Sequence, residues 1–418
     1  MSEIRLLNEA DLDGYIRVLG NAYPDFMNAN PSPSDYEAYK KRLYNTIYEE
    51  PNIHIYGLFR DNELNGLMQL YDFTMNYDGT DVGMGGVGMV AVDFYHKKAK
   101  VAKELIEFYL RYYREREVPF AALYPFRPDF YKQMGFGYGT KMNQYNLLPA
   151  ALPSKGNRKA VRPLQSSEKE QIAECYMRAY AKNHGLFAKV AKDFNRIFEN
   201  SAFRVLGYER DGELRGFSVF QFLSDPATRT NDLEIYEFVY EDRDALAALL
   251  AFYNSQADQI KHIRFNSQDP HFHHLLSDIS DGGNMVVRPI AHQSNRAGVA
   301  VMYRVIDTAG AFEALSEHNF GNQNLTVKFA IRDTFLPENA VPVTVRFSDG
   351  KPSVLGSDAA YDCEVSLDIA EFSSLFMGVV PFTMLHLYGL AEISDESQIA
   401  AVDALFRTSQ PPICMSRF

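Results

Sequence analysis

The sequence predicts a mixed α/β protein with two similar α/β units followed by an α+β unit. A buried strand, a loop, an amphipathic helix and a second buried strand follow one another within residues 87–124, which is the order of a strand–helix–strand unit. Short segments of the first unit recur later in the same order, and the pattern changes again near residue 296. We therefore expect domains at 1–150, 151–295 and 296–418. The first two should have mixed central sheets flanked by helices.

Composition describes an ordinary globular protein, with 46% hydrophobic and 23% charged residues. The first residues carry no signal-peptide pattern, and no stretch approaches the roughly 18 apolar residues of a membrane span. We therefore expect a cytoplasmic protein without a membrane span. The three cysteines, Cys175, Cys363 and Cys414, show no metal-ligand spacing and fit a reducing compartment. A net charge of −12 argues against nucleic acid as a partner.

The first unit begins with a strand at 4–7 and a helix that ends near Tyr23. A second helix is expected around residues 39–47. Two strands at 53–59 and 66–73 are then joined by a turn rich in Asp and Asn, which is typical of a hairpin.

The centre of the first unit combines a strand at 87–92, a basic loop and a helix that starts near Val101. Backbone N–H groups and the positive end of a helix dipole can hold a phosphate at such a junction. Lys97, Lys98 and Lys100 add positive charge. A solvated lysine cluster on an ordinary βα unit explains the loop equally well, because the glycines of a Rossmann or P-loop signature are absent.

The rest of the first unit contains a buried strand at 119–124 and a helical turn at 129–131. Gly135 is expected to end that turn in the left-handed conformation. A strand at 142–148 is expected to close the unit, before a linker at 150–159 that is rich in Pro, Ser, Lys and Asn.

The second unit repeats elements of the first. Val161–Leu164 echoes Ile4–Leu7 at an offset of 157 (161−4), and Arg210–Gly216 echoes Arg60–Gly66 at an offset of 150 (210−60). The position of the basic loop is taken by Glu241–Asp244. An acidic turn caps a helix well but repels an anion, so this copy is interpreted as structural.

The third unit contains a strand-like segment at 301–305 and an alternating strand at 325–331. Asp349-Gly350 predicts a hairpin turn, and helices are expected at 366–376 and 398–406. This layout resembles the sterol-carrier-protein fold, which binds apolar ligands in some relatives.

Two segments of the first unit resemble the signatures of the GNAT acetyltransferases. Val90–Ala102 stands where that family has the acetyl-CoA motif V-x-V-x-P-x-x-R-R-x-G-x-A, and Phe130–Phe136 resembles F-Y-x-x-x-G-F. Phe94 replaces the family's proline, so the loop is set less rigidly. Lysines replace both arginines, which keeps the charge but loses the bidentate geometry. Lys100 stands where the family usually has glycine, so its contact with the pyrophosphate is the weakest part of the resemblance.

The three-part order and the terminal Ser416–Phe418 resemble the Eis family of bacterial aminoglycoside and lysine N-acetyltransferases. The resemblance implies acetyl-CoA as co-substrate, no metal, Tyr131 as general acid, the Phe418 carboxylate as base, and assembly of identical subunits into a hexamer. It implies that acetyl-CoA is held by Val90, Val92, Lys97, Lys98, Lys100 and Val101.

The two catalytic assignments are chemically reasonable, and each has a simpler alternative. A phenol can donate a proton to a departing thiolate, but Tyr131 can also be a packed aromatic beside Phe130 and Phe136. A carboxylate in a cleft can accept an ammonium proton, whereas chain termini are often frayed. The apolar run 411–415 favours a packed terminus. The histidines at 271, 273 and 274 lack supporting ligands and indicate a surface loop rather than a metal site.

These observations predict an N-acetyltransferase that transfers acetyl directly to a primary amine of the aminoglycoside, polyamine or lysine type. One alternative is a non-catalytic carrier that holds an apolar ligand in its C-terminal domain. A carrier needs no phosphate-binding loop, so the lysine loop distinguishes the two functions. Another alternative is a catalytically inactive scaffold, which Lys100 and the absent arginine pair favour.

Overall fold

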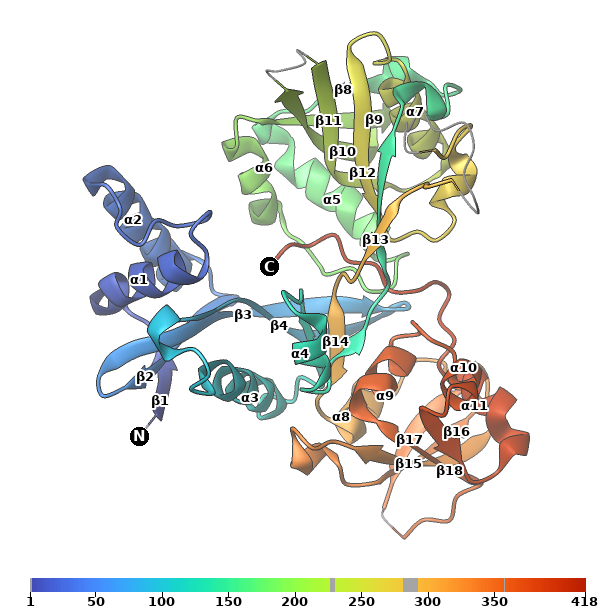
Figure 1. Ribbon diagram of the computed structural model, residues 1–418. Helices are drawn as coiled ribbons and strands as arrows, with labels where there is room; N and C mark the ends of the chain where they lie inside the picture. The colour runs from blue at the N-terminus through green and yellow to red at the C-terminus, as the bar shows by residue number, and fades with distance from the viewer. Residues whose placement is uncertain (1, 226–229, 281–291, 357) are drawn as a thin grey trace. The chain divides into compact units, whose positions relative to one another are not determined.

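The computed structural model describes residues 2–225, 230–280, 292–356 and 358–418 (Figure 1). It contains three sheets with flanking helices, which confirms the predicted mixed α/β class. Contacts group the chain into two compact units: unit 1 is Met1–Gly139, Val301–Pro411 and Ser416–Phe418, and unit 2 is Thr140–Ala300 and Pro412–Met415. The division at residues 150 and 295 stays a prediction.

The first sheet has seven strands in the order β1-β2-β3-β4-β5-β14-β6 and belongs to unit 1. Helices pack on both of its faces, because successive residues of a strand point to opposite sides. On β3, Leu67 belongs to the apolar cluster of α1, and Met68 to that of α3. The strands are β1 (Ser2–Leu6), β2 (Ile53–Arg60), β3 (Glu63–Tyr77), β4 (Thr80–Val92), β5 (Phe120–Leu123), β6 (Gly137–Tyr138) and β14 (Met302–Val305), and the helices are α1 (Leu12–Ala22), α2 (Pro33–Glu49), α3 (Val101–Arg114) and α4 (Pro128–Lys132).

Strands β3 and β4 form a hairpin longer than the sequence predicts. Its turn at Asp78-Gly79 has positive φ angles of 42° and 97°. Glycines along β4 hide the alternation of apolar residues. One of them is required for packing, because a Cβ on Gly85 would lie 2.4 Å from the ring of Tyr113 on α3.

The strand that completes the first sheet comes from a distant part of the chain. β14 lies between β5 and β6 and pairs with both in antiparallel register. The strand expected at 142–148 exists as β7 (Met142–Leu147), but it pairs with β12 and β13 in the second sheet. The expectation that it closes the first unit is therefore wrong. Alternation along a strand reveals which residues are buried but not which partner buries them.

The second sheet has the order β13-β7-β12-β11-β10-β9-β8. Its hairpin turn at Asp211-Gly212, with φ angles of 56° and 78°, corresponds to Asp61-Asn62 of the first sheet, with 51° and 64°. The matching turns support duplication. The remaining elements of unit 2 are β8 (Val161–Pro163), β9 (Phe203–Arg210), β10 (Glu213–Asp225), β11 (Thr230–Tyr240), β12 (Ile260–Ser267), β13 (Arg296–Gly298), α5 (Lys169–Tyr180), α6 (Asn195–Glu199) and α7 (Arg243–Asn254).

The third sheet has the order β17-β16-β15-β18-β19 and is part of unit 1. Its predicted hairpin turn is confirmed, with φ of 49° at Asp349 and 80° at Gly350. The helix expected at 366–376 begins only at Ile369, because the preceding residues form a strand that pairs with β15. The elements are β15 (Leu325–Arg332), β16 (Val343–Ser348), β17 (Lys351–Leu355), β18 (Cys363–Asp368), β19 (Ala391–Ile393), α8 (Thr308–Ala314), α9 (Ile369–Phe376), α10 (Phe382–Leu387) and α11 (Ile399–Leu405).

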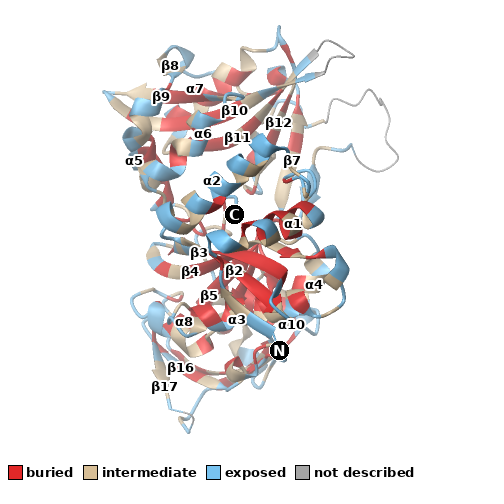
Figure 2. Ribbon diagram, turned by 90° about the vertical axis from the view of Figure 1, so that its left-hand side faces the viewer, coloured by how far each residue is buried: buried red, intermediate tan, exposed pale blue. Residues whose placement is uncertain are grey.

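Buried residues concentrate on the strands and on the helix faces that cover them (Figure 2). In the described part of the chain, no helix is both long enough and apolar enough to cross a bilayer.

Candidate functional site

Strand β4 separates from β5 halfway along its length. The two strands pair in parallel only from Met84 to Val87, whereas β4 continues to Val92. The register with β3 shifts on the same stretch, where Met89 has a φ of 49°, so β4 is bulged. The half-buried Val90 lies beyond the separation, and its carbonyl accepts a hydrogen bond from the Tyr23 hydroxyl at 2.8 Å. An opening between parallel strands beside a bulge gives an extended ligand access to backbone groups.

The loop after β4 is fixed by a buried aspartate. One carboxylate oxygen of Asp93 accepts the Tyr95 N–H at 3.0 Å, and the other binds the guanidinium of Arg17 on α1. Arg17 also donates to the Leu64 carbonyl at 2.8 Å. This pair anchors the start of the loop where the family has proline, while the side chain of Phe94 is exposed.

The lysines of the loop are exposed and stand at the start of α3. Lys98 and Lys100 have φ angles of 66° and 63°, in the left-handed region that favours glycine. The backbone at Lys100 thus keeps the conformation that explains the family's glycine. Lys100 is the N-cap of α3 and makes no side-chain cap bond. Val101 buries its side chain in the core, so only its backbone is available to a ligand at the loop. First-turn N–H groups and positive charge therefore meet at one point, which suits a phosphate.

The corresponding helix of unit 2 is capped by the protein itself. The Asp242 carboxylate accepts the N–H groups of Asp244 and Ala245 at 3.0 and 2.9 Å, at the first turn of α7. Arg210 binds Asp242 at 2.7 Å. An internal carboxylate thus occupies the position that a phosphate takes at other helix starts.

Tyr131 lies on α4 and is 2% exposed. Its ring contacts Phe126, Phe130 and Phe136, with centroids 5.3–6.0 Å apart. Burial raises the pKa of the Tyr131 phenol, and the nearby Tyr23 raises it further. The helix begins with Pro128 at its first position and is followed by Gly135 with a φ of 83°, which confirms the expected left-handed stop. Tyr131 is thus both a packed aromatic and a phenol that stays protonated at neutral pH.

The C-terminus is packed beside the bulge of β4. The ring of Phe418 lies among Tyr71, Phe73 and Tyr124, with centroids 5.6, 5.0 and 5.3 Å away. The Tyr124 hydroxyl donates to the Ser416 carbonyl at 3.0 Å. A Cβ on Gly88 of β4 would lie only 2.6 Å from the Phe418 carboxyl carbon. The terminal carboxylate therefore lies against β4, just beyond the point where β4 leaves β5.

Unit 1 thus brings together the bulged strand and the chain terminus. Tyr23 is hydrogen-bonded to that strand and close enough to Tyr131 to raise its pKa. Sequence reasoning missed Tyr23 and the aromatic residues around Phe418. The sequence signal that could have indicated the aromatic residues around Phe418 is the i, i+2 spacing of Tyr71 and Phe73, which places both rings on one face of β3.

The histidines at 271, 273 and 274 lie at a short 3-10 turn, Phe272–Leu275, with His271 as its N-cap. Among residues with described positions, no group of three or more His, Cys, Asp or Glu side chains is arranged to hold a metal ion.

Models of three domain families match the sequence. Residues 3–139 and 182–305 each match an acetyltransferase (GNAT) domain, and residues 311–415 match a sterol carrier protein domain. A comparison with curated protein sequences finds no match.

Solved structures resemble this chain over its whole length. A GCN5-related N-acetyltransferase from Kribbella flavida has a TM-score of 0.78 at 20% identity, and one from Anabaena variabilis has 0.82 at 17%. Eis1 from Mycobacterium abscessus has a TM-score of 0.75 at 20% identity. Each alignment covers 100% of both chains. At these identities the likeness establishes the fold.

Proposed function

Because the chain carries two GNAT acetyltransferase domains followed by a sterol carrier protein domain, we propose that its first GNAT domain transfers acetyl from acetyl-CoA directly to a primary amine. The domain order and the GNAT acetyltransferase class expected from the sequence are confirmed by the family matches. The observation that carries the proposal is the position of the Phe418 carboxyl group against Gly88 on the bulged part of β4.

Acetyl-CoA fits the residues at the start of α3. The uncapped first turn and the exposed Lys97, Lys98 and Lys100 would hold the pyrophosphate. The backbone of Val90 and Val92, beyond the end of the β4–β5 ladder, would pair with the pantetheine arm. When bound, acetyl-CoA supplies the activated acetyl group as a thioester.

The proposed reaction uses two groups of unit 1. The Phe418 carboxylate accepts a proton from the substrate ammonium, and the neutral amine nitrogen bonds to the acetyl carbon as the carbon–sulfur bond breaks. The acylated nitrogen then loses its second proton to solvent, which leaves the neutral amide. The Tyr131 hydroxyl gives its proton to the departing sulfur and regains one from solvent. Its raised pKa keeps the phenol protonated, although a less acidic phenol is also a weaker donor.

The terminal carboxylate also favours a cationic substrate. A negative charge held among aromatic rings attracts an ammonium group by charge and by cation–π contact. We therefore propose an amine of the aminoglycoside, polyamine or lysine type. A hexamer is the assembly that the family resemblance implies, and a cytoplasmic location stays the expectation drawn from the sequence pattern.

The packing around the third sheet is less consistent with the carrier alternative. Phenylalanine rings, with centroids typically 5–6 Å apart, fill the core between this sheet and its helices, so side chains occupy the volume that an apolar ligand would need. These residues are Phe312, Phe320, Phe329, Phe347, Phe372, Phe376 and Phe406.

A two-part experiment tests the proposal. Release of CoA from acetyl-CoA is measured against a panel of an aminoglycoside, a polyamine and a lysine peptide. Calorimetry with CoA then gives the number of sites. We expect amine-dependent release and one site per chain, because Asp242 occupies the corresponding helix start of unit 2. CoA binding without turnover on any amine would contradict the proposed activity.

A further inference from the structure

Arg304 is a fully buried charged residue on β14, with 0% exposure. Its Nη2 donates to both carboxylate oxygens of Asp333, at 2.8 and 2.7 Å. Its Nη1 donates to the main-chain carbonyl of Met134 at 2.6 Å. The guanidinium thus links the segment after β15 to Met134, two residues beyond the end of α4.

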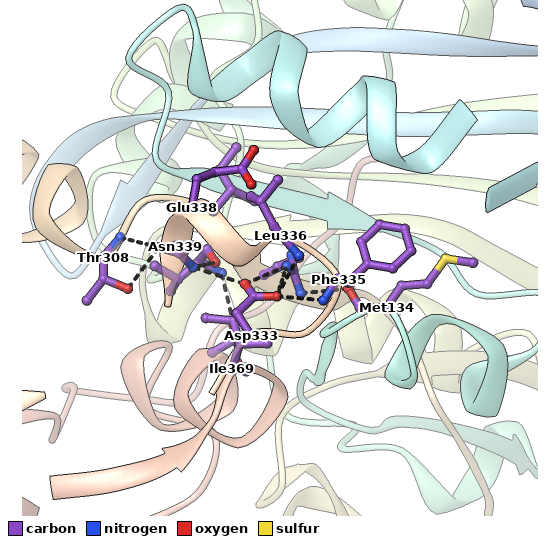
Figure 3. Close-up of polar contacts among 12 residues, drawn as sticks. Met134, Thr308, Asp333, Phe335, Leu336, Glu338, Asn339 and Ile369 are labelled. Atoms are coloured by element: carbon purple, nitrogen blue, oxygen red, sulfur yellow. Dashed lines mark hydrogen bonds and ion pairs between the residues drawn. The ribbon is translucent and has the colours of Figure 1, made fainter. Parts of the chain in front are cut away.

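Asp333 is itself held by several donors (Figure 3). One of its oxygens accepts the N–H groups of Phe335 and Leu336 at 3.2 and 2.9 Å, and the other accepts the Asn339 amide at 3.2 Å. Asn339 in turn accepts the N–H of Thr308 at 2.9 Å. A buried carboxylate with this many partners has little freedom to move, so it fixes the direction of the Arg304 fork.

The other end of the fork lies at the turn that carries Tyr131. The N–H groups of Met134 and Phe136 both donate to the Tyr131 carbonyl, at 3.0 and 3.1 Å. A Cβ on Gly135 would lie 1.4 Å from the Arg304 Nη1. The guanidinium therefore lies directly against this turn, and the glycine leaves room for it.

We propose that Arg304 is a positioning residue for Tyr131, anchored on Asp333, and that the C-terminal part of the chain thereby orients the general acid of the first GNAT domain. This inference rests on the proposed function. β14 supplies both a strand of the catalytic sheet and the fork that holds the end of α4. Arginine suits this role because its planar fork binds a carboxylate and a carbonyl together, which the single ammonium of lysine does not reproduce.

A double-mutant cycle of Arg304→Lys and Tyr131→Phe tests the inference, with kcat and the KM for acetyl-CoA measured for all four proteins. Lysine keeps the charge beside Asp333. We expect Arg304→Lys to lower kcat at least tenfold with the KM for acetyl-CoA unchanged. In the Tyr131→Phe background it should cost less than twofold, because the hydroxyl that it orients is gone.

The same cycle separates the two ways of failing. Full activity of Tyr131→Phe would refute the proposed role of the phenol, and the inference with it. An impaired Tyr131→Phe combined with an equal Arg304→Lys loss in both backgrounds, or with no Arg304→Lys loss, would refute the inference alone.

A second variant approaches the contact from the other side and does not depend on the stability of Arg304→Lys. Gly135→Ala forces the guanidinium away from Met134. Gly79→Ala is the matched control, since its φ of 97° is also positive but no atom lies within 4 Å of its added Cβ. We expect kcat to fall at least tenfold in Gly135→Ala and less than twofold in Gly79→Ala. Equal effects of the two variants would contradict the inference.

Discussion

Replacing Gly88 by alanine should displace the chain terminus without changing any charged or catalytic side chain. The added Cβ would lie 2.6 Å from the Phe418 carboxyl carbon and 3.0 Å from its oxygen. Carbon atoms pack at about 3.5–4.0 Å, so the carboxylate must retreat by roughly 1 Å. A misplacement of about 1 Å costs on the order of 10² in rate. We therefore expect kcat to fall about 100-fold.

The assay measures kcat for the best amine together with calorimetric affinity for CoA. Affinity for CoA should change little, because the lysine loop is unaltered. Gly83→Ala on the same strand is the matched control. Its Cβ would meet Val118 at 3.4 Å, an ordinary contact, and its kcat should stay within twofold of the parent protein. Full activity of Gly88→Ala would refute the assignment of the terminus as base.

Four further results are expected. The double variant Lys97→Glu/Lys98→Glu should bind CoA at least tenfold more weakly in calorimetry, since one hydrogen bond between charged groups contributes about 1.5–3 kcal/mol. Lys100→Gly should raise the free energy of unfolding in urea by about 0.5–1 kcal/mol, because it relieves a left-handed lysine. The kcat profile should not decline between about pH 8 and 10, because burial raises the pKa of Tyr131 and keeps it protonated. The contribution of Tyr77, Tyr109 and Tyr113 to the free energy of unfolding should be constant below about pH 10 and fall above it, because burial raises their folded-state pKa.

Each of these results has a control or an opposite outcome. Lys155→Glu/Lys159→Glu makes the same charge change at exposed residues of unit 2 and should leave CoA affinity unchanged; equal weakening in both double variants would indicate a general charge effect. A Lys100→Gly protein less stable than the parent would contradict the strain argument. An alkaline decline in kcat with a midpoint below about pH 10 would assign the titrating acid to another group. A free energy of unfolding that does not fall well above pH 11 would contradict the expected contribution of the buried tyrosines.

Local features of the site could be predicted because local residue types determine them. Lysines before a helix, an aromatic turn and a glycine with positive φ leave signals within a few positions of one another. The turn at Gly135 and the hairpin at Asp349-Gly350 follow the expected geometry for this reason. At Lys100 the residue type alone does not predict the backbone, because a lysine there adopts a φ of 63°, in the left-handed region that favours glycine.

Features that depend on distant pairing could not be predicted. The sequence correctly predicts both β14 and β7 as strands, but not their partners. β14 pairs with β5 in the first sheet, and β7 pairs with β12 in the second. Arg304 and Met134 are separated by 170 positions, and Tyr124 and Ser416 by 292. Their pairing depends on which strand of the sheet accepts a partner, and one sequence carries no signal of that choice. The buried pair of Arg304 and Asp333 appears only when the fold brings its members together.

The most direct test of the central claim removes the terminal charge and nothing else. Semisynthesis gives one protein that ends in Phe418 amide and a matched one that ends in the native carboxylate, and the kcat values of the two are compared at saturating acetyl-CoA and amine. The loss of a general base costs about 10²–10⁴ in rate, so the amide should be at least 100-fold slower while its affinity for CoA is unchanged. An amidated protein with full activity would contradict the claim that the chain terminus is the base.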